Sequence, residues 1–128
     1  AVERAHGRVV VDCPAGRRAD AGVPLAAAHA CLVVVSPRAF ALADAIRTRE
    51  LARELEAGLV ACAVNRVVEP PPTDAIADAL GAPVAVVPAD PRVGRSVSTE
   101  RPVVTTAPQS DAATAIQSLA DRVPACGR

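Results

Sequence analysis

The sequence predicts an α/β fold of three layers, with helices on both faces of a mostly parallel β-sheet. Four short apolar runs are typical of buried strands, and segments with helical patterning separate them. Strands that alternate with helices form parallel sheets with right-handed crossovers. Apolar residues make up 51% of the chain but aromatic residues only 1%, so the core must consist of small side chains in thin, close-packed layers.

The expected strands cover residues 8–12, 31–35, 59–64 and 84–87. The first contains the valines of the stretch VVVDCPAG, and three consecutive valines favour a strand buried on both faces. The turn that begins at Pro14 ends this strand at once. Asp12 is therefore expected at the carboxyl end of a buried strand.

The expected helices follow these strands in order. A short alanine-rich helix is predicted at 25–29, and a longer one at 39–57 with Gly58 as its C-cap. Thr73 is expected to cap a helix through residue 80 that stops at Gly81, and Asp90 to cap a helix whose first residue is proline. A last helix is expected at 110–123.

The length and charge of the chain limit its number of domains and its binding partners. A chain of 128 residues fits one domain, residues 1–128. Its 14 arginines cancel its 14 acidic residues, so no overall field attracts nucleic acid or an anionic membrane. The four cysteines lack CxxC spacing and are expected to be reduced thiols. No signal peptide and no membrane-spanning run is recognisable, and we expect a cytoplasmic protein.

Polar residues follow each expected strand. They are Asp12, Ser36-Pro37, Asn65-Arg66 and the segment 88–90. In a parallel sheet these positions share the carboxyl edge, where open α/β folds bind ligands. The sequence therefore predicts a binding site at this edge.

Asp12 has two interpretations from the residues alone. A carboxylate at the end of an apolar strand can hold the water shell of a Mg²⁺ ion beside a phosphate, or it can cap the following turn. A phosphate site also needs a loop of the form GxxxxGK[ST], and the sequence contains neither that spacing nor any lysine. Asn65 is equally open, because its amide could pair with a purine edge or close a turn.

The sequence gives little support for a zinc site, a nucleophilic cysteine or a serine hydrolase. His6 and His29 lack the spacing of a zinc site, Cys13 has no identifiable partner base, and the Ser/Thr cluster at 96–106 contains no GxSxG elbow.

Taken in order, the segments VVVDCPAG, PLAAAHACLVVVSP, LVACAVNRV, LGAPVAVVPADPRVGRSVSTERPVV and APQSDAATAIQSLADRV resemble the second half of a MinD/ParA-type P-loop ATPase. The resemblance implies that Asp12 is the Walker B carboxylate, which serves Mg²⁺ through water. It implies that Pro14, Ala15 and Gly16 form switch II, and that Asn65 and Arg66 belong to the base-binding end. Pro88 and Asp90 match the segment that lines the base pocket, with Ala89 as a departure from the family pattern.

The family's ATP-binding loop and its strand precede the region that this chain matches. The resemblance therefore implies a partial P-loop NTPase fold that lacks the Walker A strand and loop. The expected function is that of the carboxyl-terminal part of an ATPase. In the complete protein it binds ATP and Mg²⁺ and acts as a nucleotide switch for positioning or partner association. The expected partners are the amino-terminal half or a second copy in a homodimer.

Two alternatives stay open. One is a non-catalytic interaction module that keeps the fold without nucleotide, and the other is an unrelated small α/β domain of receiver or flavodoxin shape.

Overall fold

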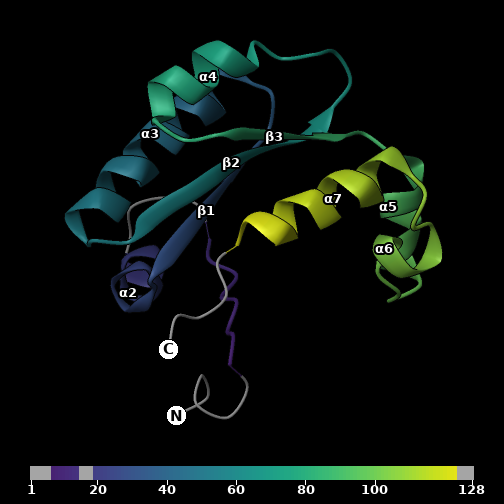
Figure 1. The fold of residues 1–128 in the computed structure, drawn as a ribbon, viewed down its shortest axis with the longest axis horizontal. Coiled ribbons are helices and arrows are strands. Elements are labelled where there is room, and N and C mark those ends of the chain that lie inside the picture. The colour runs from purple at the N-terminus through teal and green to yellow at the C-terminus, as the bar shows by residue number, and fades with distance from the viewer. Residues whose placement is uncertain (1–6, 15–18, 124–128) are drawn as a thin grey trace.

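A computed structural model describes residues 7–14 and 19–123, and Figure 1 shows its arrangement. Helices and strands alternate through most of the chain, as the sequence predicts. The elements are α2 (Ala19–Ala27), β1 (Ala30–Val35), α3 (Ala39–Glu54), β2 (Gly58–Val67), α4 (Thr73–Leu80), β3 (Val84–Pro88), α5 (Pro91–Ser98), α6 (Val103–Thr106) and α7 (Asp111–Arg122).

The described strands form one parallel sheet in the order β1-β2-β3. Helix α3 connects β1 to β2, and α4 connects β2 to β3, so each connection is a helical crossover. Helices α3 and α4 pack on one face, whereas α7 packs on β3 and β2 from the opposite face (Figure 1). The predicted three-layer arrangement with a parallel sheet is confirmed.

The two faces of the sheet have different cores. On the α3 and α4 face, Val33 and Val64 are buried among the larger aliphatic residues Ile76 and Leu80. On the α7 face the buried residues are mostly alanines, namely Ala61, Ala63, Ala112 and Ala113. Alanine side chains let a helix approach a sheet closely, so α7 lies in a thin layer of the kind the composition predicts.

Two helix ends follow their predicted signals. The Asp90 side chain accepts a hydrogen bond from the backbone N–H of Arg92 at the start of α5, as predicted. Ser110, expected as the first residue of the last helix, is instead the N-cap of α7, and its side chain accepts a hydrogen bond from the backbone N–H of Ala113. Gly81 ends α4 in the left-handed conformation with φ 65°.

Other helix ends differ from the prediction. Helix α2 begins at Ala19, ahead of the predicted residue 25, and α6 has no counterpart among the predicted helices. Pro72, not Thr73, is the N-cap of α4. Helix α3 ends before Leu55, and Gly58 begins β2 instead of capping α3. The left-handed residue in this turn is Glu56, with φ 58°, so a glycine near a helix end is not always the residue that reverses the chain.

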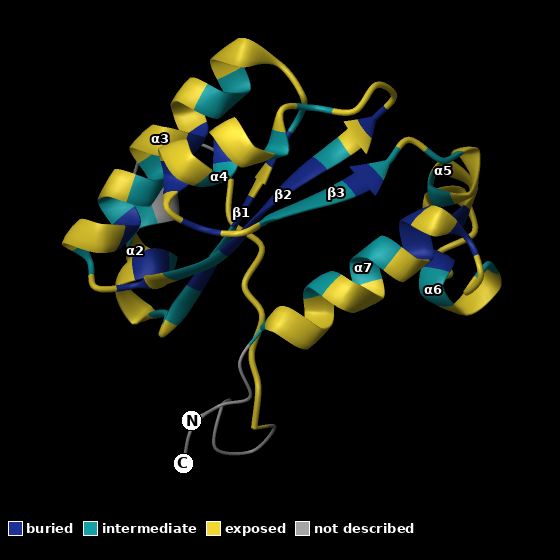
Figure 2. Ribbon diagram, turned by 45° about the horizontal axis from the view of Figure 1, so that its top comes forward, coloured by how far each residue is buried: buried dark blue, intermediate teal, exposed yellow. Residues whose placement is uncertain are grey.

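The predicted strand at residues 8–12 is not formed. This segment belongs to no sheet, and Val9, Val10 and Val11 are 46%, 83% and 58% exposed. Figure 2 shows it as an exposed stretch below the sheet. Valines favour an extended backbone, but a strand is buried only when neighbouring strands accept its ladder bonds, and none of the described strands does so.

Strand β1 lies at an edge of the described sheet, where it pairs only with β2. Its side chains alternate between the two faces, so Cys31, Val33 and Val35 are buried against α3 while Val34 on the other face is 59% exposed. The outer edge of β1 therefore pairs with no described strand, and part of one face of the sheet is left uncovered.

None of the helices among the described residues combines the length and apolar character needed to cross a membrane.

Candidate functional site

The carboxyl end of β2 contains a β-bulge that separates Asn65 from Val67. Asn65 is opposite Val87 and Val67 is opposite Pro88, so Arg66 is an extra residue with no partner on β3. Arg66 has φ 61°, in the left-handed region. That conformation costs a residue other than glycine about 1–2 kcal/mol, and such strain is common at functional sites.

The Asn65 side chain is half-buried at this bulge and is partly used by the backbone. Its Oδ1 accepts a hydrogen bond from the backbone N–H of Arg66 at 2.9 Å. Its Nδ2 donates to no described residue. By strand alternation Asn65 shares the α7 face with Ala61 and Ala63. The amide therefore offers two N–H donors at the carboxyl edge of the sheet.

The turn at residues 88–90 lies next to Asn65, because Asn65 pairs with Val87. The N–H of Ala89 donates to the carbonyl of Val67 at 2.8 Å, which fixes the turn to the end of β2. Asp90 Oδ1 accepts bonds from the backbone N–H of Arg92 at 2.8 Å and from Arg92 Nε at 3.0 Å. The predicted base-binding residues Asn65, Pro88 and Asp90 thus share one edge of the sheet.

Groups at the start of α5 stabilise the charged form of Asp90. The backbone N–H of Arg92 lowers the pKa of this carboxyl, and the guanidinium groups of Arg92 and Arg95 lower it further. Asp90 is therefore a charged helix cap whose Oδ1 is already engaged by Arg92.

The side chain of Arg66 lies apart from that of Asn65. It lines an open hollow of about 510 Å³ at the ends of β1 and β2, together with Arg38 and the proline run 70–72, and Asn65 is not part of this lining. The family resemblance assigns both Asn65 and Arg66 to the base-binding end, but in the structure Arg66 lines this hollow and Asn65 does not.

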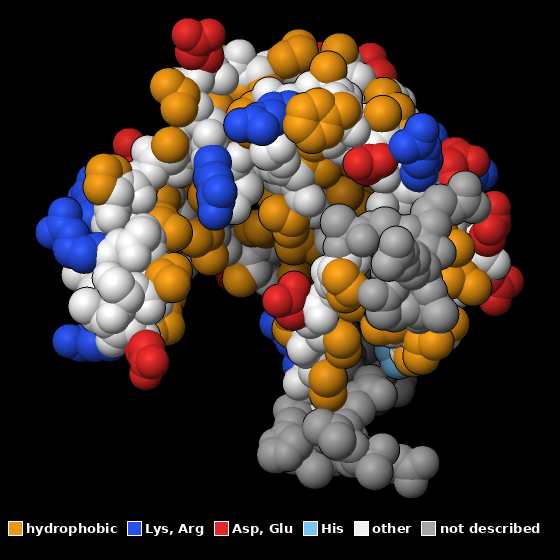
Figure 3. All heavy atoms as spheres, turned by 180° about the vertical axis from the view of Figure 1, so that it is seen from behind, with side chains coloured by type: hydrophobic (Ala, Val, Ile, Leu, Met, Phe, Trp, Pro, Cys, Tyr) orange, Lys and Arg blue, Asp and Glu red, His pale blue; other side chains and the backbone are white. Residues whose placement is uncertain are grey.

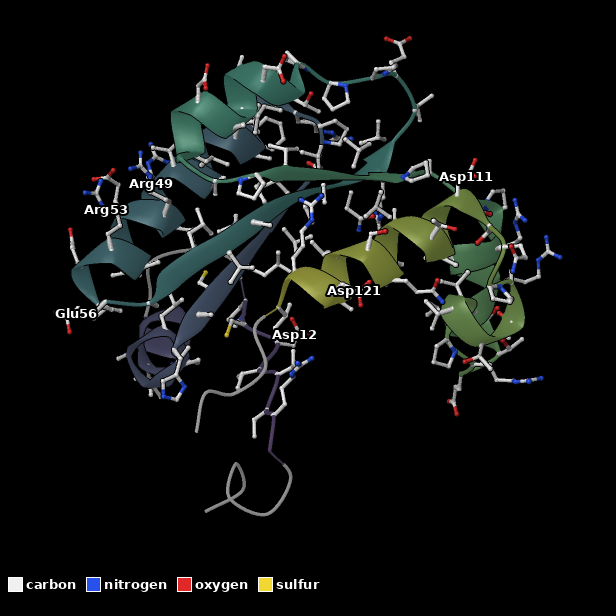
Figure 4. The ribbon with its side chains drawn as sticks, viewed as in Figure 1. Asp12, Arg49, Arg53, Glu56, Asp111 and Asp121 are labelled. Carbon is white, nitrogen blue, oxygen red and sulfur yellow. The ribbon has the colours of Figure 1, made fainter. Side chains whose placement is uncertain are left out.

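Asp12 lies on the extended segment 7–14 and is exposed. Figure 4 shows it below the sheet, away from the carboxyl ends of β2 and β3. Of the residues expected to form switch II, Pro14 is exposed, whereas Ala15 and Gly16 lie outside the described residues. Of the four groups expected at the carboxyl edge, Asp12 is the one that the structure does not bring there.

The described residues hold no group of three or more His, Cys, Asp or Glu side chains that could bind a metal ion. Mg²⁺ usually keeps several waters and takes only one or two carboxylates, with phosphate oxygens as further ligands. The exposed Asp12 carboxylate can contact a water molecule bound to Mg²⁺, but one carboxylate cannot form a magnesium site alone.

Sequence reasoning missed one group of charged residues. Arg92, Arg95 and Arg101 line a second hollow, beside α5 and α6. The signal that could have found them is the spacing of Arg92 and Arg95, which puts them on one helix face.

Comparison with known proteins identifies the fold. No protein-family model matches the sequence. The cell division ATPase MinD of Pyrococcus furiosus aligns with a TM-score of 0.79 and 27% identity, over 88% of this chain and 49% of that one. The chain shares its fold with the MinD/ParA-type P-loop ATPases. This confirms the resemblance seen in the sequence.

Further relatives agree with this assignment. The septum site-determining protein MinD of Pyrococcus horikoshii, solved with Mg-ADP, aligns with a TM-score of 0.79 and 26% identity over 88% of this chain and 48% of that one. An uncharacterized ATP-binding protein of Methanocaldococcus jannaschii is 31% identical over 119 residues, which are 90% of this chain and 45% of the relative. The chain thus spans about half the length of the MinD-type proteins that it matches.

Proposed function

We propose that this chain is the carboxyl-terminal part of a MinD/ParA-like ATPase and contributes the base-binding end of its ATP site. In the complete protein this site binds ATP and Mg²⁺, and the nucleotide acts as a switch for positioning or for association with partners. The cytoplasm is its expected location, since the four cysteines of the sequence lack the spacing of a disulfide framework or a metal site.

The observation that supports the proposal most directly is the position of Asn65. Its two Nδ2 donors are unused by the described residues, and it lies beside the turn at residues 88–90 on the edge where parallel α/β sheets bind ligands. A purine offers ring-nitrogen acceptors to such an amide. The likeness to a MinD solved with Mg-ADP supports the same assignment.

The phosphate-binding part of the site has to come from elsewhere. No segment of the 128 residues has the form GxxxxGK[ST], and there is no lysine to contact phosphate oxygens. Positioned amides and cations supply most of the catalysis in phosphoryl transfer. The 128-residue chain alone is therefore expected to show no measurable ATP hydrolysis.

The test is to express the chain joined to the sequence encoded upstream of it. If that sequence contains a KGGxGK[ST] motif, the joined protein should bind a fluorescent ATP analogue and hydrolyse ATP in a phosphate-release assay. A joined protein that carries the motif but neither binds nor hydrolyses ATP would overturn the proposal.

A second candidate is an interaction module that keeps the fold without nucleotide. The uncovered edge of β1 and the exposed Val34 favour it, because an open parallel edge can accept a strand from another protein. The same experiment separates the two candidates. An upstream sequence without the phosphate loop, together with no ATP binding, would favour the module.

A further inference from the structure

The second hollow lies beside α5 and α6, close to the Asp90 cap. It measures about 380 Å³, which falls within the size range of small-molecule pockets, and it opens to solvent. Its lining comes from two helices and the turn between them: Arg92, Arg95, Ser96, Thr99, Arg101, Thr106 and Ala107. Asn65 is not part of it, so the hollow is separate from the proposed base-binding amide.

The hollow carries excess positive charge. Arg92 pairs with Asp90 through Nε and Oδ1 at 3.0 Å. Arg95 and Arg101 have no ion-pair partner among the described residues. The whole chain has a formal net charge of zero, so this concentration of charge is local. Figure 3 shows arginine side chains over the α5 and α6 end of the molecule, at the left of that view.

A strained turn brings Arg101 to the same hollow as Arg95. The N–H of Arg101 donates to the carbonyl of Ser96 at 3.0 Å, five residues back, which closes the end of α5 as a Schellman-type turn. The left-handed position of this turn, usually a glycine, is Glu100 with φ 53°. A residue other than glycine costs about 1–2 kcal/mol there, and strain of this kind is common at ligand-binding sites.

The hydroxyl groups in the lining are already used as donors. Thr99 Oγ1 donates to the carbonyl of Arg95 at 3.0 Å, and Thr106 Oγ1 donates to that of Pro102 at 3.3 Å. Recognition therefore has to come from the guanidinium groups. A planar guanidinium donates two parallel N–H bonds to a pair of oxygens, a geometry that matches phosphate.

We propose that this hollow binds a small molecule bearing a phosphate or diphosphate group, held by Arg95 and Arg101. Arg92 adds positive charge while remaining paired with Asp90. None of the proposed base-binding residues Asn65, Arg66, Pro88 and Asp90 lines this hollow. The Arg92–Asp90 ion pair is the contact that joins the two regions.

The probe is inorganic pyrophosphate, titrated into the 15N-labelled chain at constant ionic strength, with amide and arginine Nε–Hε shifts as the readout. Saturable shifts confined to α5, α6 and the turn between them are expected. Arg95→Gln and Arg101→Gln should each weaken the apparent affinity at least tenfold while the rest of the spectrum stays folded. Inorganic phosphate and glycerol 3-phosphate, titrated in the same way, show whether a diphosphate is needed or a monoester suffices.

The matched control is Arg53→Gln. Arg53 is exposed, has no ion pair with a described residue, and lies on α3 at the opposite end of the molecule (Figure 4). The Arg53→Gln substitution removes the same unit of charge. The pyrophosphate affinity of this variant should therefore stay within twofold of that of the unmodified chain. Equal losses in all three variants, or shifts that do not saturate, would overturn the proposal. Asn65→Ala should leave pyrophosphate binding unchanged, which separates this site from the proposed ATP site.

Discussion

The side-chain Oδ1 of Asn65 accepts a hydrogen bond from the backbone N–H of the next residue, Arg66, at 2.9 Å. The bond lies at the bulge of β2, where Arg66 takes a left-handed conformation. It orients the Asn65 amide and leaves Nδ2 as the group that can face a ligand. The two parts of the amide can therefore be tested separately.

Asn65→Ala, in the chain joined to its amino-terminal half, should weaken ATP relative to GTP by roughly 1–3 kcal/mol, because the purine edge loses its amide partner. Asn65→Asp keeps an oxygen that can accept from Arg66 but lacks the Nδ2 donors. It should lose the ATP preference while unfolding at nearly the same urea concentration as the parent protein. Calorimetric titrations with ATP and GTP measure both effects. An unchanged ATP preference in Asn65→Ala would show that the base-pocket assignment is wrong.

Asp12→Ala, in the same joined protein, should lower Mg²⁺-dependent ATP hydrolysis by roughly one to several orders of magnitude. Adenine preference should remain, since this carboxylate is proposed to serve the metal and not the base. The control is Asp121→Ala, which removes an exposed carboxylate from α7. Phosphate release measured over a range of Mg²⁺ concentrations is the assay. Comparable hydrolysis by the Asp12 and Asp121 variants would contradict the role of Asp12.

Substitutions at Arg66 should follow its backbone conformation. Arg66→Gly removes the cost of the left-handed conformation and should keep or raise the free energy of unfolding by up to about 1 kcal/mol. Arg66→Val places a β-branched residue at positive φ and should lower the free energy of unfolding by at least about 1 kcal/mol. Urea unfolding followed by circular dichroism ranks the stabilities of the two variants and the parent chain. If valine were tolerated as well as glycine, the bulge would not hold Arg66 in this conformation in solution.

The elements that sequence patterns predicted best are those whose signals are local. Asp90 caps α5 with a side chain that accepts the backbone N–H two residues on, so a few residues suffice to predict it. The strand at residues 8–12 depends on neighbouring strands, and none of the described strands pairs with it. The bulge at Arg66 and the turn at Glu100 are left-handed positions without the usual glycine, so composition gave no sign of them.

Ser110→Ala should lower the free energy of unfolding by about 1 kcal/mol, because Ser110 Oγ accepts the N–H of Ala113 at 3.2 Å in a buried position. Ser118→Ala, on the exposed side of the same helix, makes the same chemical change without removing a cap and should have little effect. Urea midpoints of the two variants provide the comparison. Equal midpoints would mean that the Ser110 cap adds nothing to the stability of α7.

The uncovered edge of β1 should make the 128-residue chain associate with itself. An edge strand presents unpaired backbone groups, and the exposed Val34 and the valines at 9–11 add apolar surface. At ~100 µM, sedimentation velocity should show dimers or larger species, since exposed apolar edges promote association in this concentration range.

Val34→Lys should shift the chain toward monomer, because a charged side chain beside an edge opposes strand pairing. Val68→Lys provides the matched control, since Val68 is 84% exposed but follows the end of β2. A monodisperse monomer with slow amide exchange at Val9, Val10 and Val11 would contradict this prediction, because it would mean that the segment finds its ladder partners within the chain.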